Sequence, residues 1–202
     1  GSNSTVITSS GQGVSLFTIG GGVRITGIGF RMYGSTNLIN ASGKGWRIDH
    51  CSFSRVDDVG VSGAYAVFTK GSNVASSPAG LIDNSTFNDC RIYAGGVSSF
   101  NEQHKIWNAP AGFGDQDAVY VEDNDITRIA QGNVIDASYS GKYVFRFNTY
   151  RYANIEAHDM PTPNGSRATR RTEIYNNIAI GNYETTKKYQ RPGHIRGGET
   201  LI

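Results

Sequence analysis

The feature that most constrains this chain is an internal repeat. Residues 133–150 (NVIDASYSGKYVFRFNTY) are a near-copy of residues 37–53 once a short insertion is allowed, so that Trp46 aligns with Tyr143 and Phe53 with Tyr150. Repetition on this scale is typical of architectures built by stacking one structural unit. The repeat therefore predicts a fold made of equivalent units.

The second half of the repeat occurs six times. Each copy has two apolar residues two positions apart, then a small or amide residue, then a bulky residue. The second apolar residues lie 23 to 39 residues apart and are Ile25, Ile48, Ile82, Val121, Phe145 and Ile174. Period-two alternation predicts short strands, and variable spacing above a fixed minimum indicates a constant coil with insertions. We therefore expect an all-β solenoid of about six to seven coils, in which each strand pairs in parallel with its equivalent one turn later.

Two stretches resemble a known family. Residues 46–54 (WRIDHCSFS) are similar to the Trp-Ile-Asp-His stretch of pectate lyases, and residues 173–178 (EIYNNI) are similar to their strand-ending asparagine pair. Asn124, Asn148 and Asn177 fall at one position of successive coils and resemble that class's internal asparagine ladder. The chain thus resembles the pectate-lyase-like superfamily, which implies a right-handed, single-stranded parallel β-helix that is extracellular or on the cell surface.

The length of the chain suits one continuous solenoid. Its 202 residues can form a single β-helix domain spanning residues 1–202. The two cysteines, Cys51 and Cys90, fall at different coil positions and are expected to be free, buried thiols. Both ends have apolar residues, such as Val6 and Ile202, without a polar cap, so we expect either a portion of a longer β-helix or self-association through the ends.

Charge is unevenly distributed along the chain. Residues 1–141 contain 9 Lys/Arg and 12 Asp/Glu, which gives a formal net charge of −3. Residues 142–202 contain 10 Lys/Arg and 5 Asp/Glu, which gives a formal net charge of +5. Such asymmetry favours an acidic partner. The basic residues are too dispersed to predict a nucleic-acid partner, and no apolar run is long enough to predict a membrane span.

The first strand of the repeat carries candidate functional residues. Alternation along the strand turns Asp136 outward, and aligning residues 155–158 and 195–197 on it predicts an outward column of Asp136, Glu156 and Arg196. His158 falls in the neighbouring column with Ser138 and Gly198. Two carboxylates on adjacent strands repel each other unless a cation or a proton lies between them. This column therefore predicts either a Ca²⁺ site or an acid–base pair.

The resemblance assigns roles to these residues. Pectate-lyase-like enzymes hold Ca²⁺ between acidic side chains and uronate carboxylates, and an arginine removes the proton α to the carboxylate. By that resemblance Asp136 and Glu156 are candidate metal ligands, and His158, Arg196 and Arg170 are candidate catalytic residues. Arg167 and Arg171 are alternatives for the arginine. The competing interpretation is a solvated ladder of charges along the solenoid.

A second outward column lies on the other strand of the repeat. It contains three acids in succession followed by an arginine, at Asp49, Asp83, Glu122 and Arg146. Arg24 and Arg47 lie beside it and are expected to pair with the acids laterally. We expect a structural ladder here, with weak Ca²⁺ binding as the alternative.

The largest insertion runs from Cys90 to Val119 and contains Trp107 and Phe113. It either flanks a sugar-binding groove or packs flat on the solenoid. Three functions stay open: an enzyme that cleaves an acidic polysaccharide, a non-catalytic carbohydrate-binding module such as an adhesin or tailspike shaft, and a structural module that stacks.

Overall fold

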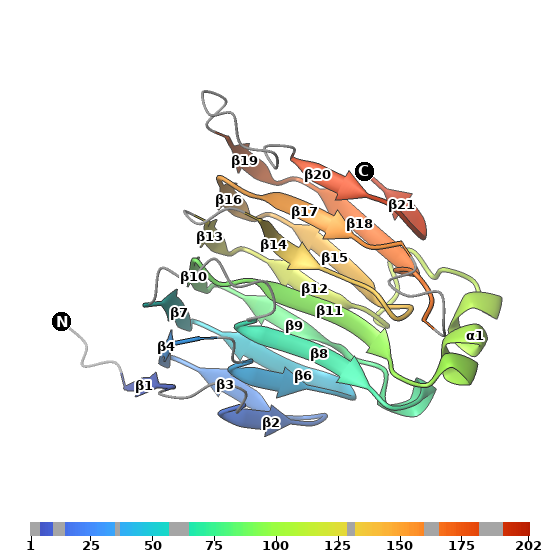
Figure 1. The fold of residues 1–202 in the computed structure, drawn as a ribbon, viewed down its shortest axis with the longest axis horizontal. Coiled ribbons are helices and arrows are strands. Elements are labelled where there is room, and N and C mark those ends of the chain that lie inside the picture. Colours follow the sequence, from blue (N-terminus) through green and yellow to red (C-terminus); the bar gives the residue numbers. More distant parts are fainter. Residues whose placement is uncertain are drawn as a thin grey trace.

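The computed structural model describes residues 5–9, 15–34, 37–56, 65–128, 132–159, 166–181 and 192–202. These residues form three parallel sheets of seven strands each. Successive strands along the chain belong to different sheets. Each strand pairs with the strand three places later in the chain, as β1 does with β4 (Figure 1). The protein is therefore a parallel β-helix of seven coils, which confirms the predicted fold class.

The three sheets run along the solenoid. Sheet A consists of β1 (Val6–Thr8), β4 (Gly29–Met32), β7 (Ser52–Arg55), β10 (Thr86–Asn88), β13 (Asp125–Thr127), β16 (Thr149–Arg151) and β19 (Ile178–Ile180). Sheet B consists of β2 (Phe17–Ile19), β5 (Ile39–Ala41), β8 (Val67–Gly71), β11 (Ile92–Val97), β14 (Asn133–Asp136), β17 (Asn154–Ala157) and β20 (Gly193–Ile195). Sheet C consists of β3 (Arg24–Thr26), β6 (Lys44–Asp49), β9 (Ala79–Asp83), β12 (Val119–Glu122), β15 (Lys142–Arg146), β18 (Arg171–Tyr175) and β21 (Glu199–Leu201).

The core consists of rows of apolar side chains that run from coil to coil along each sheet. The predicted anchors of sheet C lie in register from Ile25 to Ile174 along adjacent strands. In sheet A the rings of Phe30, Phe53 and Phe87 stack, with centroids 5.0 and 4.8 Å apart. Because each coil buries its apolar side chains against the coils above and below, stability comes from stacking rather than from any single coil.

The predicted second strand of the repeat is in fact two strands, in sheets C and A. The residue after each of the first six sheet C strands has a positive φ. The first is Gly27, and the others are His50, Asn84, Asp123, Phe147 and Asn176, with φ of 52°, 48°, 56°, 58° and 55°. A left-handed residue turns the chain sharply, and Asn, Asp and His adopt this conformation more readily than most residues. The turn explains why Gly, His, Asn or Asp occupies five of these six positions.

The asparagine ladder lies inside these turns, as predicted. Nδ2 of Asn124 donates to Oδ1 of Asn148 at 3.0 Å, and Nδ2 of Asn148 donates to Oδ1 of Asn177 at 3.2 Å. Asn148 also donates to the carbonyl oxygens of Val121 and Arg146. The amides therefore satisfy backbone groups that water cannot reach.

Replacing Asn148 with leucine is expected to lower the free energy of unfolding by about 1–3 kcal/mol, because it leaves buried polar groups without partners. Denaturant unfolding would measure this loss. Asn88→Leu is a matched control, because Asn88 is exposed at the end of β10. An equal effect of both substitutions would contradict the ladder's contribution.

The predicted acidic column of sheet C is also in register, from Asp49 through Asp83 to Glu122. Arg24 binds both oxygens of Asp49 at 2.8 and 2.7 Å, and Arg47 binds Asp83 in the same way. The hydrogen bond from Arg24 is the main cause that holds the pKa of Asp49 well below its usual range. These lateral pairs support the structural interpretation of this column over a Ca²⁺ site.

The insertion before Val119 begins later than predicted. Residues 92–97 form β11 of sheet B, so the insertion starts at Ser98 and contains α1 (Phe100–Asn108), at one edge of the stack in Figure 1. A short 3₁₀ helix, η1 (Val74–Ser76), lies between β8 and β9. Neither helix in the described residues has the length and apolar character that a membrane crossing requires.

Both cysteines are free and buried, as predicted. Apolar side chains are exposed in the terminal coils, including Val6 in β1 and Ile178 in β19. The expectation that the ends contact further coils or a second copy stays a prediction, as does the assignment of residues 1–202 to a single domain.

Candidate functional site

The outward face of sheet B brings two predicted site residues together. Ile135 in β14 pairs with Ile155 in β17, so the next residues, Asp136 and Glu156, are lateral neighbours. Ile135 and Ile155 point into the core, and alternation therefore turns the two carboxylates outward. The predicted acidic pair thus exists on adjacent coils.

The predicted position of Arg196 in this column is wrong by two residues. Glu156 pairs with His194 in β20, and Arg196 lies one position beyond the paired strands, next to His158. Gly198 is correspondingly not in the column of His158. Arg196 still reaches the acidic pair, because its long side chain extends back along the sheet, and its Nη2 lies 2.6 Å from Oε1 of Glu156.

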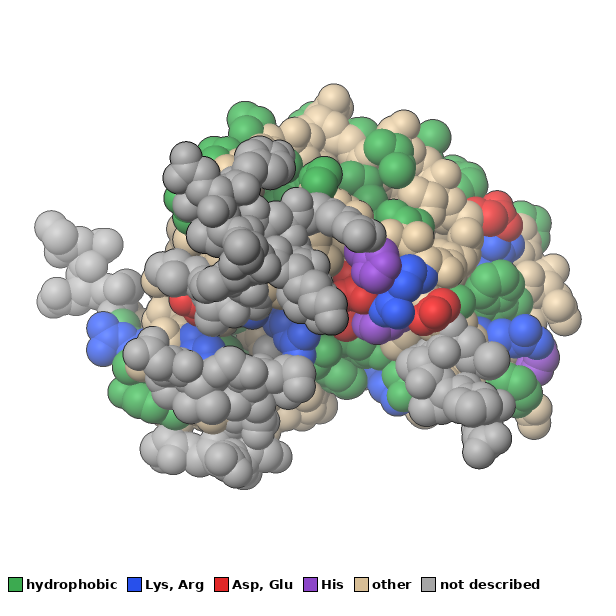
Figure 2. Space-filling model, turned by 45° about the horizontal axis from the view of Figure 1, so that its top comes forward, with side chains coloured by type: hydrophobic (Ala, Val, Ile, Leu, Met, Phe, Trp, Pro, Cys, Tyr) green, Lys and Arg blue, Asp and Glu red, His purple; other side chains and the backbone are tan. Residues whose placement is uncertain are grey.

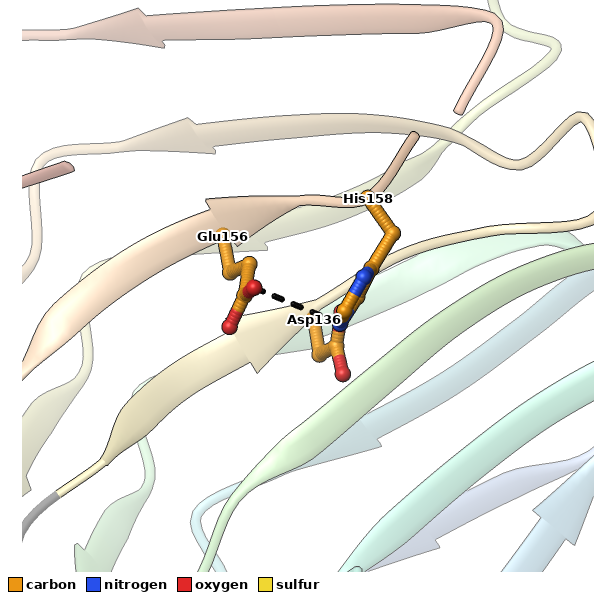
Figure 3. A group of neighbouring side chains, drawn as sticks. All are labelled: Asp136, Glu156 and His158. Atoms are coloured by element: carbon orange, nitrogen blue, oxygen red, sulfur yellow. Dashed lines mark ion pairs between the residues drawn. The ribbon is translucent and has the colours of Figure 1, made fainter. Parts of the chain in front are cut away.

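The His158 ring contacts both carboxylates (Figure 3). Its Nε2 is 3.3 Å from Oδ1 of Asp136 and 3.3 Å from Oε1 of Glu156. The side chains of Asp136, Glu156 and His158 are 8%, 13% and 29% exposed. A half-buried imidazole with a carboxylate on each side can accept a proton that both neighbours stabilise.

The protonation of His158 follows from these contacts. Its pKa is raised above the ordinary value of 6.5, mainly by the close contact with the Asp136 carboxylate, although burial and the Arg196 charge act in the opposite direction. Oδ1 of Asp136 lies within ion-pair distance of the ring, but the geometry there is poor for a hydrogen bond and this buried oxygen has no other partner. It therefore keeps an acceptor position for a further ligand.

The remaining contacts surround Glu156. Nδ2 of Asn133 donates to its Oε2 at 2.6 Å, and Nδ1 of His194 lies 3.8 Å from its Oε1. Arg196 contacts the His158 ring as well as Glu156, and its Nη1 is 3.4 Å from Oδ1 of Asp159. Figure 2 shows histidine, acidic and basic side chains adjoining on one face of the molecule. We call Asp136, Glu156, His158 and Arg196 the sheet B cluster.

The sheet B cluster offers donors to a metal ion. One ligand atom each from Asp136, Glu156 and His158 can be chosen so that all lie within 4.8 Å of one another. The two carboxylates are the hard oxygen donors that Ca²⁺ prefers, and the unused Oδ1 of Asp136 fits a cation. Ca²⁺ takes six to eight oxygens in general, so water or a bound carboxylate would have to supply the others.

Arg170 is not part of the sheet B cluster. It is buried, forms an ion pair with Glu199, and donates from Nη2 to the carbonyl oxygen of Ala109 at 2.9 Å. Its guanidinium carbon lies 5.2 Å from the ring centroid of Trp107. Among the described residues, these contacts direct Arg170 to the end of α1 and to β21 rather than to Asp136 and Glu156.

The sequence pattern missed the aromatic neighbours of the cluster. Tyr93 pairs with Asp136 one coil earlier, and its hydroxyl contacts Ser138. The rings of Phe68 and Tyr93 are stacked at 4.6 Å, and Tyr65 packs against both. Because the ring faces cover each other, these residues form a structural edge of the site rather than a surface for a ligand. Tyr93 was missed because the predicted insertion included β11.

Comparisons with known proteins add no family assignment: no family model, curated protein or solved structure matches this chain.

Proposed function

We propose that this chain is an extracellular β-helix protein, similar to the pectate-lyase-like superfamily, that binds an acidic polysaccharide at the sheet B cluster and cleaves it by β-elimination. The supporting observation is the position of His158, 3.3 Å from each of two carboxylates, with Arg196 beside it. β-Elimination of a uronate needs a positive charge for the substrate carboxylate and a group that moves a proton. Arg196 and His158 supply these two functions.

The proposed mechanism assigns one task to each residue. Arg196 binds the uronate carboxylate and thereby stabilises the negative charge that develops at the adjacent carbon. Neutral His158 removes the proton from that carbon, a carbon–carbon double bond forms, and the bond to the glycosidic oxygen breaks. The imidazolium then returns the proton to the departing oxygen. Asp136 stabilises the imidazolium, and Glu156 positions Arg196.

Calcium remains part of this proposal. Asp136 and Glu156 would hold the ion, which would neutralise the uronate carboxylate. Arg196 already contacts Glu156 and provides a positive charge for the uronate carboxylate. We therefore expect Ca²⁺ to assist substrate binding rather than to be indispensable. If so, Ca²⁺ raises the rate over that in EDTA, and the Asp136→Asn variant loses this response.

The test is cleavage of acidic polysaccharides. Polygalacturonate, alginate and glucuronan are incubated with the protein, with Ca²⁺ or EDTA, and the unsaturated product is followed by its ultraviolet absorbance. We expect absorbance to rise with at least one of them. No rise in any condition would contradict cleavage.

A non-catalytic glycan-binding module, such as an adhesin or tailspike shaft, is the second candidate. It is supported by the balance of charge in the cluster, where the cation Arg196 contacts Glu156 and His158 contacts both acids. Binding on a glycan array without unsaturated product would select this function.

A further inference from the structure

A second candidate site lies on a different face of the solenoid. A cleft of about 640 Å³ lies on the outward side of sheet C, over β6, β9 and β12. Its floor is one row across three coils, because Arg47 pairs with Leu81 and Leu81 pairs with Tyr120. Its volume is within the range of about 300–1,000 Å³ that is typical of small-molecule sites.

Charged side chains border the cleft, and each has a partner of opposite sign. Nζ of Lys44 lies 2.6 Å from Oδ1 of Asp117. Arg47 binds Asp83, and Glu122 binds Arg146. The lining therefore contains two cations, Lys44 and Arg47, and two anions, Asp117 and Glu122, with no net charge. A charged ligand would gain little from this balance, whereas an uncharged ligand rich in hydroxyl groups finds both donors and acceptors.

The floor adds an apolar surface. The ring of Tyr120 and the side chain of Leu81 lie side by side between the charged groups. A pyranose ring has the matching composition, with an apolar C–H face and hydroxyl groups around its edge, and aromatic side chains combine apolar area with a polar handle in the same way.

The wall of the cleft is held in place by buried groups. Residues 116–118 form this wall, and Asp115 just before them accepts from Nη1 of Arg171 at 2.7 Å and from the Tyr120 hydroxyl through its backbone oxygen. The Arg171 side chain is 0% exposed, and Glu173 accepts from the backbone of Gly114. Holding a loop in one conformation before binding lowers the entropy that a ligand must overcome.

We propose that this cleft binds a neutral sugar unit of a glycan, separately from the acidic substrate of the sheet B cluster. Tyr120 and Leu81 contact the apolar face of the pyranose. Lys44, Arg47, Asp117 and Glu122 bind its hydroxyl groups.

The test uses the full chain and saturation-transfer NMR with cellotriose, mannotriose and galactotriose as probes, and trigalacturonate as the acidic comparison. We expect at least one neutral trisaccharide to bind with a Kd of about 1 mM. Tyr120→Ala and, independently, Leu81→Gln are expected to weaken binding at least about tenfold. Tyr120→Phe should retain binding because it keeps the ring, while Arg171 still holds Asp115 in the absence of the hydroxyl.

Two control variants separate this site from others. Tyr33→Ala removes an exposed aromatic ring outside the cleft, and Glu156→Gln alters only the sheet B cluster, so both should bind the neutral sugar normally. Failure of all three neutral trisaccharides to bind would overturn the proposal. So would unchanged binding by correctly folded Tyr120→Ala and Leu81→Gln, or displacement of the neutral sugar by trigalacturonate in the Glu156→Gln variant.

Discussion

Replacing His158 with alanine is expected to lower the rate of uronate cleavage by about 10²–10⁴-fold, the usual contribution of a positioned acid–base group. The reason is geometric, because His158 is the group between Asp136 and Glu156 that can take a proton and return it. The rate of unsaturated product formation at saturating polysaccharide measures the effect. A rate equal to that of the unmodified chain would contradict the mechanism.

The pH profile distinguishes a proton-transfer role from a structural one. Because the mechanism uses neutral His158 and Asp136 raises its pKa, the rate should rise with pH through a midpoint above 6.5. Asp136→Asn removes the main cause of that shift, so its midpoint should move toward lower pH. His50→Asn is the matched control: His50 is exposed on another face, and asparagine tolerates its left-handed conformation. This variant should keep the normal rate and midpoint.

Much of the fold could be predicted from the sequence because the solenoid repeats its chemistry on every coil. The apolar anchors of sheet C recur at one position of the coil, and the ladder asparagines recur at another. Stacking requires such equivalent residues to lie in register. The acidic pair was predictable for the same reason, since Ile135 and Ile155 fix which residues face outward.

The register of the last coil was not predictable from alternation. His194 and Arg196 both fall on the outward side of their strand, so a shift of two residues leaves the facing pattern unchanged. Backbone pairing, which opposes His194 to Glu156, decides between them. The strand containing Tyr93 was missed because Ala94-Gly95-Gly96 weakens the apolar pattern, although Ile92 and Tyr93 pair normally.

Arg170 illustrates a different limit. Arg167, Arg170 and Arg171 are close in sequence, and alternation does not tell which partners long side chains will find. In the structure these arginines bind the insertion: Arg167 contacts His104, Arg170 contacts Ala109, and Arg171 contacts Asp115. Their shared task is to attach the insertion to the solenoid.

The second large effect follows from that attachment. Replacing Arg171 with methionine is expected to lower the free energy of unfolding by about 3–5 kcal/mol, because it removes one partner of a buried ion pair. Nε of Arg171 lies 3.3 Å from Oε1 of Glu173, and both side chains are almost fully buried. Its Nη1 also donates to the carbonyl oxygens of Ala111 and Gly112. Denaturant unfolding monitored by circular dichroism measures the loss.

Two further variants identify the cause. In Arg171→Met/Glu173→Met no buried charge is left without a partner, so part of the lost stability should return, and the double-mutant cycle gives the coupling between the two residues. Arg151→Met removes the partner of Asp125 at the surface and should change stability by at most about 1 kcal/mol. If Arg171→Met costs no more than Arg151→Met, the buried pair does not anchor residues 111–115, and the wall of the sheet C cleft is held by its other contacts, among them those of Tyr120 and Lys44.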